Sequence, residues 1–282
     1  MTVKNDIPPA FIAAQVKLAL LEDIGQQDLT ADLIPEAAQA SAQLISRQSA
    51  ILCGQSWFNE VFSQLDDQIQ IDWYFQDGEV IAPNQVICTL KGSARKLLTG
   101  ERTAMNFLQT LSGTATTTHR YAQRIADLTV QLLDTRKTLP GLRSAQKYAV
   151  RCGGGVNHRF GLFDAILIKE NHIQAAGSIT AAVAQAKHCH PGVSVEVEVE
   201  TLAELSQAIQ AETDIVLLDN FSLEQLTQAV VLNDGQSLLE ASGGITLDNL
   251  RAIAETGVDR ISIGALTKDI QAVDLSLRFI DA

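Results

Sequence analysis

The sequence has 282 residues, and its 33 acidic and 21 basic side chains leave a net charge of −12. Such an acidic chain is unsuited to nucleic acid or to a membrane surface, because both are anionic. Its apolar runs are too short to cross a bilayer, and the opening MTVKNDIPP lacks the apolar region of a signal peptide. Four cysteines in no paired spacing favour reduced thiols. We therefore expect a soluble, cytoplasmic protein.

The first third of the chain predicts an α+β layer. Residues 10–24 have the apolar spacing of a helix, and residues 93–112 predict a second long helix. Between the two helices lie three runs with strand-like alternation, at residues 42–54, 69–75 and 85–92. Turn signals at Asp77-Gly78 and Pro83-Asn84 separate the second run from the third.

Past Gly113 the pattern changes to alternating strands and helices. Helical spacing at residues 202–210, 223–232 and 247–255 falls between apolar, strand-like runs. Repeated βα units predict a parallel sheet, and six in succession favour a βα barrel over a doubly wound sheet, although the pattern does not exclude the latter. The length suits one large α/β barrel or a barrel with a modest extra domain. The six predicted strands are residues 130–135, 165–169, 194–199, 214–219, 237–242 and 260–264.

Basic residues gather in one segment of this acidic chain. Residues 134–172 contain seven Lys or Arg side chains against three acidic ones. A local cluster of cations in an acidic protein predicts a site for a small, highly charged anion. Each predicted strand also ends on a polar or glycine position, and the active sites of βα barrels are built at that end.

Three parts of this segment contain candidate anion ligands. Arg136-Lys137 follows the first barrel strand, and Lys169 ends the second. Arg binds a carboxylate or phosphate through two parallel hydrogen bonds, and Lys adds a compact charge. The glycine triplet at 153–155, followed by Asn157-His158-Arg159, is either a hinge or an anion-binding turn. Taken alone, each of these residues could equally be a solvated or structural one.

Carboxylates follow at two more strand ends. Glu196, Glu198 and Glu200 alternate with valines, so we expect them to face the barrel interior, with Glu198 nearest the opening. On an exposed edge strand they would merely be solvated. Asp219 ends the apolar strand DIVLLD, where it could bind a ribose hydroxyl or Mg²⁺, directly or through water. The alternative, a helix cap, suits Ser222 better.

The last two strand ends predict a phosphate site. Ser242-Gly243-Gly244 precedes a helix, and Ile263-Gly264-Ala265 ends the final strand. Late loops of βα barrels commonly bind phosphate through backbone N–H groups and a helix N-terminus.

Arg102, on the long helix of the first domain, would by itself be interpreted as a surface residue.

These segments together resemble the quinolinate phosphoribosyltransferase family. The similar stretches run in order over nearly the whole chain: LLEDIG, LLTGERTAMNFLQTLSG, LLDTRKTLPGLRSAQKYAVRCGGGVNHR, DAILIKENHI, VEVEVE, LLDN, SGGI and SIGALTKDIQAVDLSLRF. The resemblance implies an N-terminal α/β sandwich domain (1–114) and an incomplete, seven-stranded, TIM-like βα barrel (115–268). It also implies a C-terminal segment (269–282) that returns to the first domain. A homodimer or dimer-based hexamer with shared active sites is expected, with Mg²⁺ as cofactor.

The resemblance further implies the reaction and the residues that carry it. Quinolinate and phosphoribosyl pyrophosphate would give nicotinate mononucleotide, pyrophosphate and CO₂, in NAD biosynthesis. The implied catalytic residues are Lys137, Lys169, Glu198 and Asp219, with Glu198 and Asp219 also serving Mg²⁺. The implied substrate ligands are Arg102 from a partner subunit, Thr135, Arg136, Lys137, His158, Arg159, Lys169, Glu198, Asp219, Ser242, Gly243, Gly244, Ile263, Gly264 and Ala265.

Two other functions remain open at this point. A related phosphoribosyltransferase found beside molybdenum transport could act on another acid, although the intact TRKTLPGLR and NHR segments argue against it. A non-catalytic sensor of phosphoribosyl pyrophosphate could keep the phosphate loops, but it would not need both the cations and the Glu198/Asp219 pair.

Overall fold

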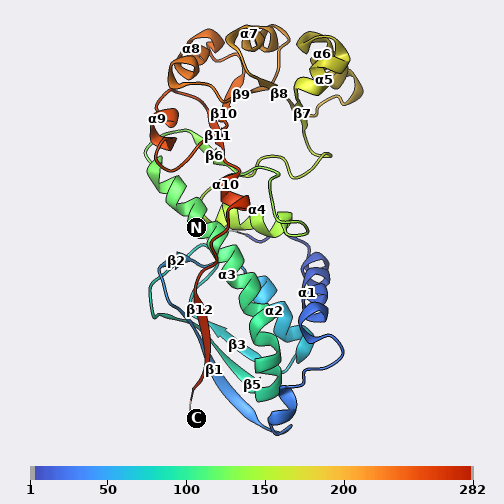
Figure 1. Cartoon of the computed structure of the whole chain (residues 1–282), viewed down its shortest axis with the longest axis vertical. Coiled ribbons are helices and arrows are strands. Elements are labelled where there is room, and N and C mark those ends of the chain that lie inside the picture. The colour runs from blue at the N-terminus through green and yellow to red at the C-terminus, as the bar shows by residue number, and fades with distance from the viewer. Residues whose placement is uncertain (1–3, 281–282) are drawn as a thin grey trace. The chain divides into compact units, whose positions relative to one another are not determined.

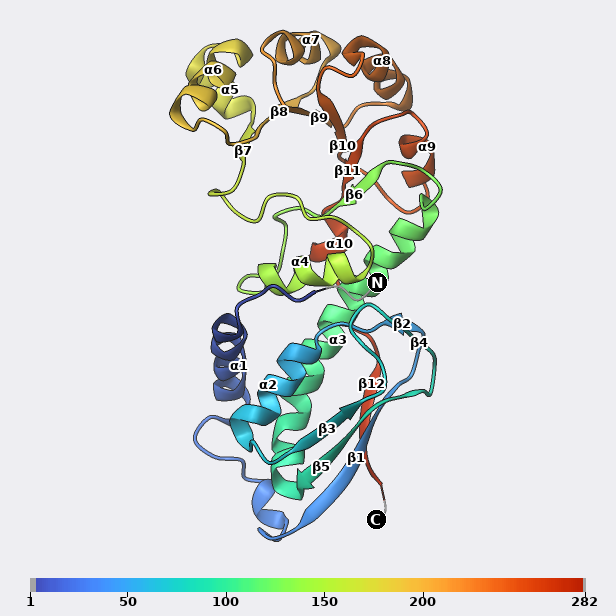
Figure 2. The same ribbon diagram turned by 180° about the vertical axis from the view of Figure 1, so that it is seen from behind.

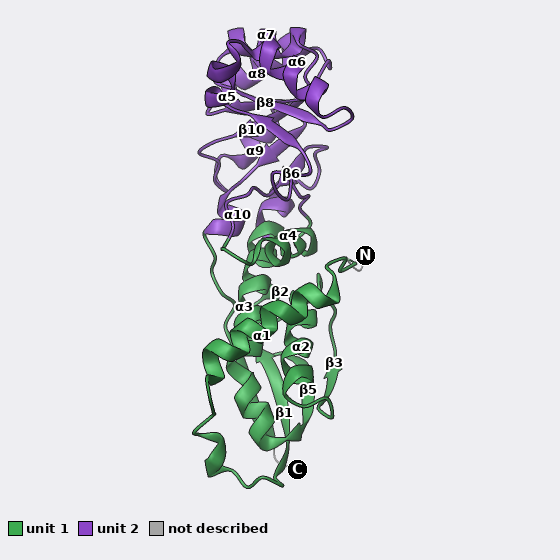
Figure 3. Cartoon of the chain, turned by 90° about the vertical axis from the view of Figure 1, so that its right-hand side faces the viewer, with its two compact units in different colours: residues 1–119, 139–154, 269–282 green, residues 120–138, 155–268 purple. Residues whose placement is uncertain are grey.

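The computed structural model describes residues 4–280 (Figure 1). The chain divides into two compact units (Figure 3). The first unit contains residues 1–119, 139–154 and 269–282, and the second contains residues 120–138 and 155–268. Among the described residues, no helix is both long and apolar enough to cross a membrane.

The first unit is an antiparallel sheet covered by helices. Its sheet has the order β12-β1-β5-β3, and the C-terminal strand β12 pairs with β1. The helices pack on this sheet through a core that includes Trp57, Phe58 and Phe62 (Figure 1). Its elements are α1 (Pro9–Ile24), η1 (Ala31–Leu33), β1 (Gln39–Ser46), β2 (Ala50–Ile51), α2 (Gln55–Leu65), β3 (Gln70–Trp73), β4 (Val80–Ile81), β5 (Val86–Ser93), most of α3 (Ala94–Arg124), α4 (Arg143–Cys152) and β12 (Leu275–Ile280).

The second unit is a parallel sheet with the strand order β6-β11-β10-β9-β8-β7. Helices lie on the outside of this curved sheet (Figure 2). Its strands are β6 (Gln131–Leu133), β7 (Ile166–Ile168), β8 (Val195–Val199), β9 (Ile215–Asp219), β10 (Leu238–Ser242) and β11 (Arg260–Ser262). Its helices are α5 (Glu170–Ala176), α6 (Ile179–Cys189), α7 (Leu202–Gln210), α8 (Leu223–Asn233), α9 (Leu250–Ala254) and α10 (Ala265–Lys268).

Local signals fix where the barrel helices begin. Thr201 and Ser222 accept hydrogen bonds from the third backbone N–H of α7 and α8, and Glu204 and Gln225 reach back in reciprocal capping boxes. Ser222, and not Asp219, is therefore the cap of α8, which leaves Asp219 available at the end of β9.

The six predicted strands form a parallel sheet and lie where the apolar runs predicted them, and the sheet is open between β6 and β7. In the described residues the sheet has six strands rather than seven, but Val156 adds a single parallel bridge to Leu133 beside β6. This bridge occupies the place of a seventh strand. The residues on either side of Val156 form no further strand.

Two boundaries differ from the expected ones. The helix predicted to end at residue 112 continues to Arg124, so the expected domain boundary at residue 114 lies inside α3. The small residues there favour close packing and not a loop: a Cβ on Gly113 would lie 2.3 Å from the Gln271 carbonyl oxygen. Residues 139–154, expected in the barrel, cluster by their contacts with the first unit, and residues 269–280 cluster with the same unit.

Candidate active site

A pocket of about 440 Å³ opens at the C-terminal ends of the parallel strands, entirely within the second unit. The convergence of polar strand ends predicted from the sequence is therefore present in the structure. The pocket lining consists of Thr135, Arg136, Lys137, His158, Arg159, Leu167, Lys169, Glu198, Leu217, Asp219, Ser242 and Ser262.

Two guanidinium groups lie near one another in this pocket. Burial lowers the pKa of Arg159, and the positive charge of Arg136 lowers it further. Arg159 also donates a hydrogen bond to the Ala165 carbonyl oxygen at 3.4 Å, which directs its side chain. Like charges held together in a partly buried place repel each other, so this geometry favours an anion between or beside them.

Acidic and basic side chains face each other at the ends of β7, β8 and β9. The Lys169 ammonium forms an ion pair with the Glu198 carboxylate. Burial raises the pKa of Asp219, and the negative charge of Glu198 raises it further, while Lys169 and Lys137 lower it. Asp219 therefore lies near one negative charge, that of Glu198, and near two positive charges, those of Lys169 and Lys137. Mg²⁺ prefers oxygen ligands such as the carboxylates of Glu198 and Asp219.

Lys137 lines the pocket and packs closely against Gly264, which has no side chain. A Cβ on Gly264 would lie 2.9 Å from Lys137 Cδ. The Lys137 backbone is held on both sides: its N–H donates to Thr135 Oγ1 at 3.0 Å, and its carbonyl oxygen accepts from Thr267 Oγ1 at 2.8 Å. Gly264 thus contributes to the site by making room for a lysine as well as through its own backbone.

The phosphate candidates lie as predicted at the ends of β10 and β11. Ser242 is the last residue of β10, and Gly243 and Gly244 follow with φ values of 92° and 58°. Ser242 lines the pocket itself. Ile263 and Gly264 connect β11 to α10, which begins at Ala265.

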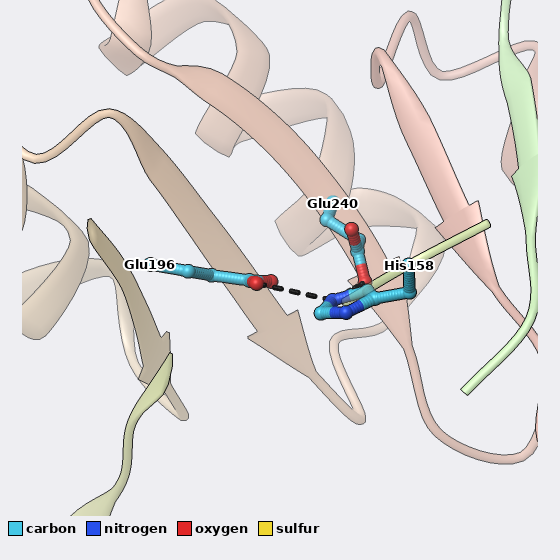
Figure 4. Close-up of side chains that lie close together, drawn as sticks. All are labelled: His158, Glu196 and Glu240. Carbon is cyan, nitrogen blue, oxygen red and sulfur yellow. Dashed lines mark ion pairs between the residues drawn. The ribbon is translucent and has the colours of Figure 1, made fainter. Parts of the chain in front are cut away.

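His158, which lines the pocket, contacts two buried carboxylates, as Figure 4 shows. Its Nε2 lies 3.0 Å from Glu196 Oε2 and 3.4 Å from Glu240 Oε1. Glu196 and Glu240 are only 3% and 0% exposed. The inward orientation expected for the glutamates of β8 is confirmed for Glu196 and Glu198, whereas Glu200 lies beyond the strand end and is exposed.

The hydrogen bonds of His158 identify its tautomer. Burial lowers the pKa of His158, but Glu196 and Glu240 outweigh burial and raise it to about 10. Burial also raises the pKa of Glu196. The Arg159 backbone N–H donates to His158 Nδ1 at 2.8 Å, so Nδ1 carries a lone pair and the ring proton is on Nε2. The ring of His158 is therefore neutral. The additional proton that the raised pKa values of His158 and Glu196 describe lies on one of the two glutamates.

This tautomer bears on metal binding. His158, Glu196 and Glu240 offer three ligand atoms within 4.8 Å of one another. A metal ion on Nε2 would need the lone pair there, and the proton would then have to be on Nδ1, opposite another N–H donor. The cluster therefore fits a hydrogen-bonded group better than a metal site, and Glu198 with Asp219 is the better candidate for a cation.

Sequence reasoning missed three acidic residues that shape the site. Asp134 accepts hydrogen bonds from Asn157 Nδ2 at 2.7 Å and from the His158 backbone at 2.9 Å. Asp164 accepts from two backbone N–H groups of the loop after Arg159. The third residue, Glu240, was hidden in the apolar run of β10; a charged residue inside such a run was the available signal.

Arg102 is the one candidate ligand that belongs to the first unit among those named from the sequence. It lies exposed on α3, beside Glu101, whose pKa is raised by burial and lowered in part by the Arg102 charge. Arg102 is not among the residues that line the pocket described above.

Comparison with known proteins agrees with this architecture. The model of the quinolinate phosphoribosyl transferase N-terminal domain matches residues 28–112, and that of the C-terminal domain matches residues 114–278. A solved nicotinate-nucleotide pyrophosphorylase from Francisella tularensis is 51% identical, with a TM-score of 0.96 and 99% of both chains covered. The corresponding structure from Ehrlichia chaffeensis is 33% identical, with a TM-score of 0.91, and covers 95% of this chain and 98% of that one.

Curated relatives are similar over comparable lengths. A probable nicotinate-nucleotide pyrophosphorylase (carboxylating) of Bacillus subtilis is 42% identical, over 91% of this chain and 89% of its own. The Mycobacterium leprae nicotinate-nucleotide pyrophosphorylase (carboxylating) is 38% identical, over 93% of this chain and 95% of its own. Because both family models match in order and the relatives align over nearly their full lengths, the chain belongs to the quinolinate phosphoribosyltransferase family.

Proposed function

We propose that this protein converts quinolinate and phosphoribosyl pyrophosphate to nicotinate mononucleotide, pyrophosphate and CO₂, a step of NAD biosynthesis. The observation that carries the proposal is the composition of the pocket. Two guanidinium groups and two lysines line it together with the Glu198/Asp219 pair, and Lys169 forms an ion pair with Glu198. Relatives of this chain carry the names of this enzyme, which agrees with the chemistry. A cytoplasmic location remains a prediction from the sequence.

The cations account for the first substrate. Quinolinate has two adjacent carboxylates, and Arg136, Arg159 and Lys169 offer the charge to bind them. The repulsion between Arg136 and Arg159 is relieved when an anion binds, which adds to the affinity for a doubly charged ligand. Lys137, which shares the pocket, serves the carboxylates or the departing pyrophosphate.

Glu198 and Asp219 account for the ribose and its cation. Both carboxylates end neighbouring strands, and each can accept a hydrogen bond from a ribose hydroxyl. The like-charge repulsion that raises the pKa of Asp219 would be relieved by Mg²⁺, held directly or through water. When bound, Mg²⁺ offsets the negative charge of the leaving pyrophosphate.

The chemistry asks mainly for positioning and for charge stabilisation. Transfer at C1′ develops oxocarbenium character, which the carboxylates Glu198 and Asp219 stabilise while the pocket aligns the ring nitrogen. After transfer, the pyridinium nitrogen accepts the electrons released as the 2-carboxylate leaves as CO₂. C2 then takes up a proton.

The loop after β10 accounts for the 5′-phosphate and also supports Asp219. Asn220, whose φ is 56°, donates from its amide to Asp219 at 2.9 Å and from its backbone to the Ser242 carbonyl at 2.9 Å. A Cβ on Gly243 would lie 2.2 Å from Asn220 Oδ1. The phosphate loop and the ribose carboxylate are therefore coupled through one asparagine.

The place of Arg102 in the first unit supports a shared active site. Arg102 lies outside the unit that holds every other proposed ligand, and the sequence resemblance assigns it to substrate binding across a two-fold interface. We propose a homodimer, or a hexamer of such dimers, in which Arg102 completes the partner's pocket.

The substrate assignment predicts strong discrimination against nicotinate, which lacks the 2-carboxylate. Each lost charge-assisted hydrogen bond costs about 1.5–3 kcal/mol, so kcat/KM should fall roughly ten- to a hundredfold or more. Steady-state assays with both acids measure this ratio. Arg251→Ala removes an exposed arginine that pairs with Asp127 and Glu255, and it should leave the ratio unchanged. Comparable kcat/KM values for the two acids would overturn the assignment.

The role of the carboxylates predicts a change in Mg²⁺ dependence. Glu198→Gln and Asp219→Asn should lower kcat by about a hundredfold and shift the Mg²⁺ concentration needed for half-maximal rate. Calorimetry should show nearly unchanged binding of quinolinate alone. Glu200→Gln is the matched control, because Glu200 follows the same strand but is exposed. Wild-type rates in both site variants at limiting Mg²⁺ would contradict the proposed role.

The coupling through Asn220 predicts that Gly243→Ala damages two subsites. Affinity for phosphoribosyl pyrophosphate should fall by roughly tenfold, because the new methyl group displaces Asn220 and with it Asp219. Gly235→Ala is the control. Gly235 has φ 73°, and no atom lies within 4 Å of the added methyl group, so this variant introduces backbone strain without displacing a neighbour. Equal affinities in the two variants would mean that the phosphate loop does not depend on this contact.

The shared-site model predicts complementation between two inactive variants. Arg102→Ala and Lys169→Ala should each be nearly inactive, but unfolding and refolding them together should give mixed dimers in which one site carries neither defect. About a quarter of wild-type activity should return by this symmetry. Mass spectrometry checks that subunits have exchanged. Exchange without recovered activity would show that Arg102 acts within its own chain.

A further inference from the structure

The carboxylates beneath the pocket have no part in the reaction as described above. Glu196 is on β8 and Glu240 is on β10, with β9 between them, and both side chains point into the barrel toward His158 (Figure 4). Within the described residues, Glu196 Oε1 and both oxygens of Glu240 have no hydrogen-bond partner. Two buried carboxylates add little to stability compared with apolar residues of similar size. The role of Glu196 and Glu240 is therefore to be found in the side chain that they contact, His158.

The ring of His158 is held at both of its nitrogens. Nε2 donates to Glu196, and Glu240 Oε1 lies 3.4 Å from the same nitrogen. Nδ1 accepts from the backbone N–H of Arg159 at 2.8 Å. The ring therefore connects the barrel interior to the backbone of Arg159, a residue that lines the pocket.

We propose that Glu196 and Glu240 are positioning residues, which fix the His158 ring so that Nδ1 holds the Arg159 amide and directs its guanidinium toward the substrate carboxylates. This inference rests on the proposed function, because it assigns the two glutamates to the quinolinate half of the site. Glu196 makes the shorter contact and should matter more than Glu240. Neither residue touches substrate, and neither serves the phosphoribosyl half.

The test compares substitutions that remove the acceptor with substitutions that keep it. Glu196→Leu and Glu240→Leu remove the oxygens, whereas Glu196→Gln and Glu240→Gln keep an amide oxygen that can accept from Nε2. Calorimetry gives the dissociation constants for quinolinate and, separately, for phosphoribosyl pyrophosphate. Asn233→Leu is the control, since it breaks the buried hydrogen bonds of Asn233 with Ser237, outside the pocket.

The proposal predicts a selective and graded effect. Glu196→Leu should weaken quinolinate binding by roughly tenfold or more, and Glu240→Leu by less, with phosphoribosyl pyrophosphate binding nearly unchanged. The Gln variants should bind quinolinate nearly as the wild type does. The control should melt at a lower temperature but keep its quinolinate affinity. Unchanged quinolinate affinity in the Leu variants, or an equal loss for both substrates, would overturn the proposal.

Imidazole ¹⁵N NMR of the wild-type protein tests the same idea without relying on a variant that folds. The His158 spectrum should show an unprotonated Nδ1 and a protonated Nε2. A protonated Nδ1 would overturn the proposal, because that nitrogen could not accept from Arg159. The two hypotheses can also fail separately: a wild-type protein that does not bind quinolinate refutes the proposed function, while the NMR spectrum still decides whether His158 is held in this way.

Discussion

Repulsion between two cations is the constraint around which the site is built. Arg136 and Arg159 lie near enough that the charge of the first lowers the pKa of the second, in a protein whose net charge is −12. Nothing in the two side chains favours this approach by itself. The surrounding structure has to hold both backbones in place. Glu196 and Asp164 offset part of the repulsion at Arg159, and a doubly charged anion would offset more of it.

The parallel sheet provides most of this support. Strands that run in one direction deliver their C-terminal ends to one opening, so residues far apart in sequence meet without long loops. Arg136 follows β6, and Lys169, Glu198 and Asp219 lie at the ends of β7, β8 and β9. Buried carboxylates complete the support from below: Asp134 holds the His158 backbone, and Glu196 holds its ring.

The sequence allowed the repeated βα units to be predicted from their periodicity. Most of the pocket lining was predicted from polar strand ends together with the family resemblance, but Leu167 and Leu217 were not named. Glu240 was missed because a single carboxylate in an apolar strand gives no periodic pattern, and its charge inside that run was the one local signal. The continuation of α3 past residue 112 was missed because Gly113 and the threonines after it are typical of loops, and only tertiary packing against Gln271 requires a helix there. The tautomer of His158 depends on a backbone N–H that sequence alone cannot orient.

The central claim is that these charges serve a decarboxylating phosphoribosyl transfer. The most direct measurement incubates the purified protein with quinolinate labelled in its 2-carboxylate, phosphoribosyl pyrophosphate and Mg²⁺, and quantifies all three products. The account predicts labelled CO₂, pyrophosphate and unlabelled nicotinate mononucleotide in equal amounts. Binding of phosphoribosyl pyrophosphate without any product, or a nucleotide that retains the label, would contradict it.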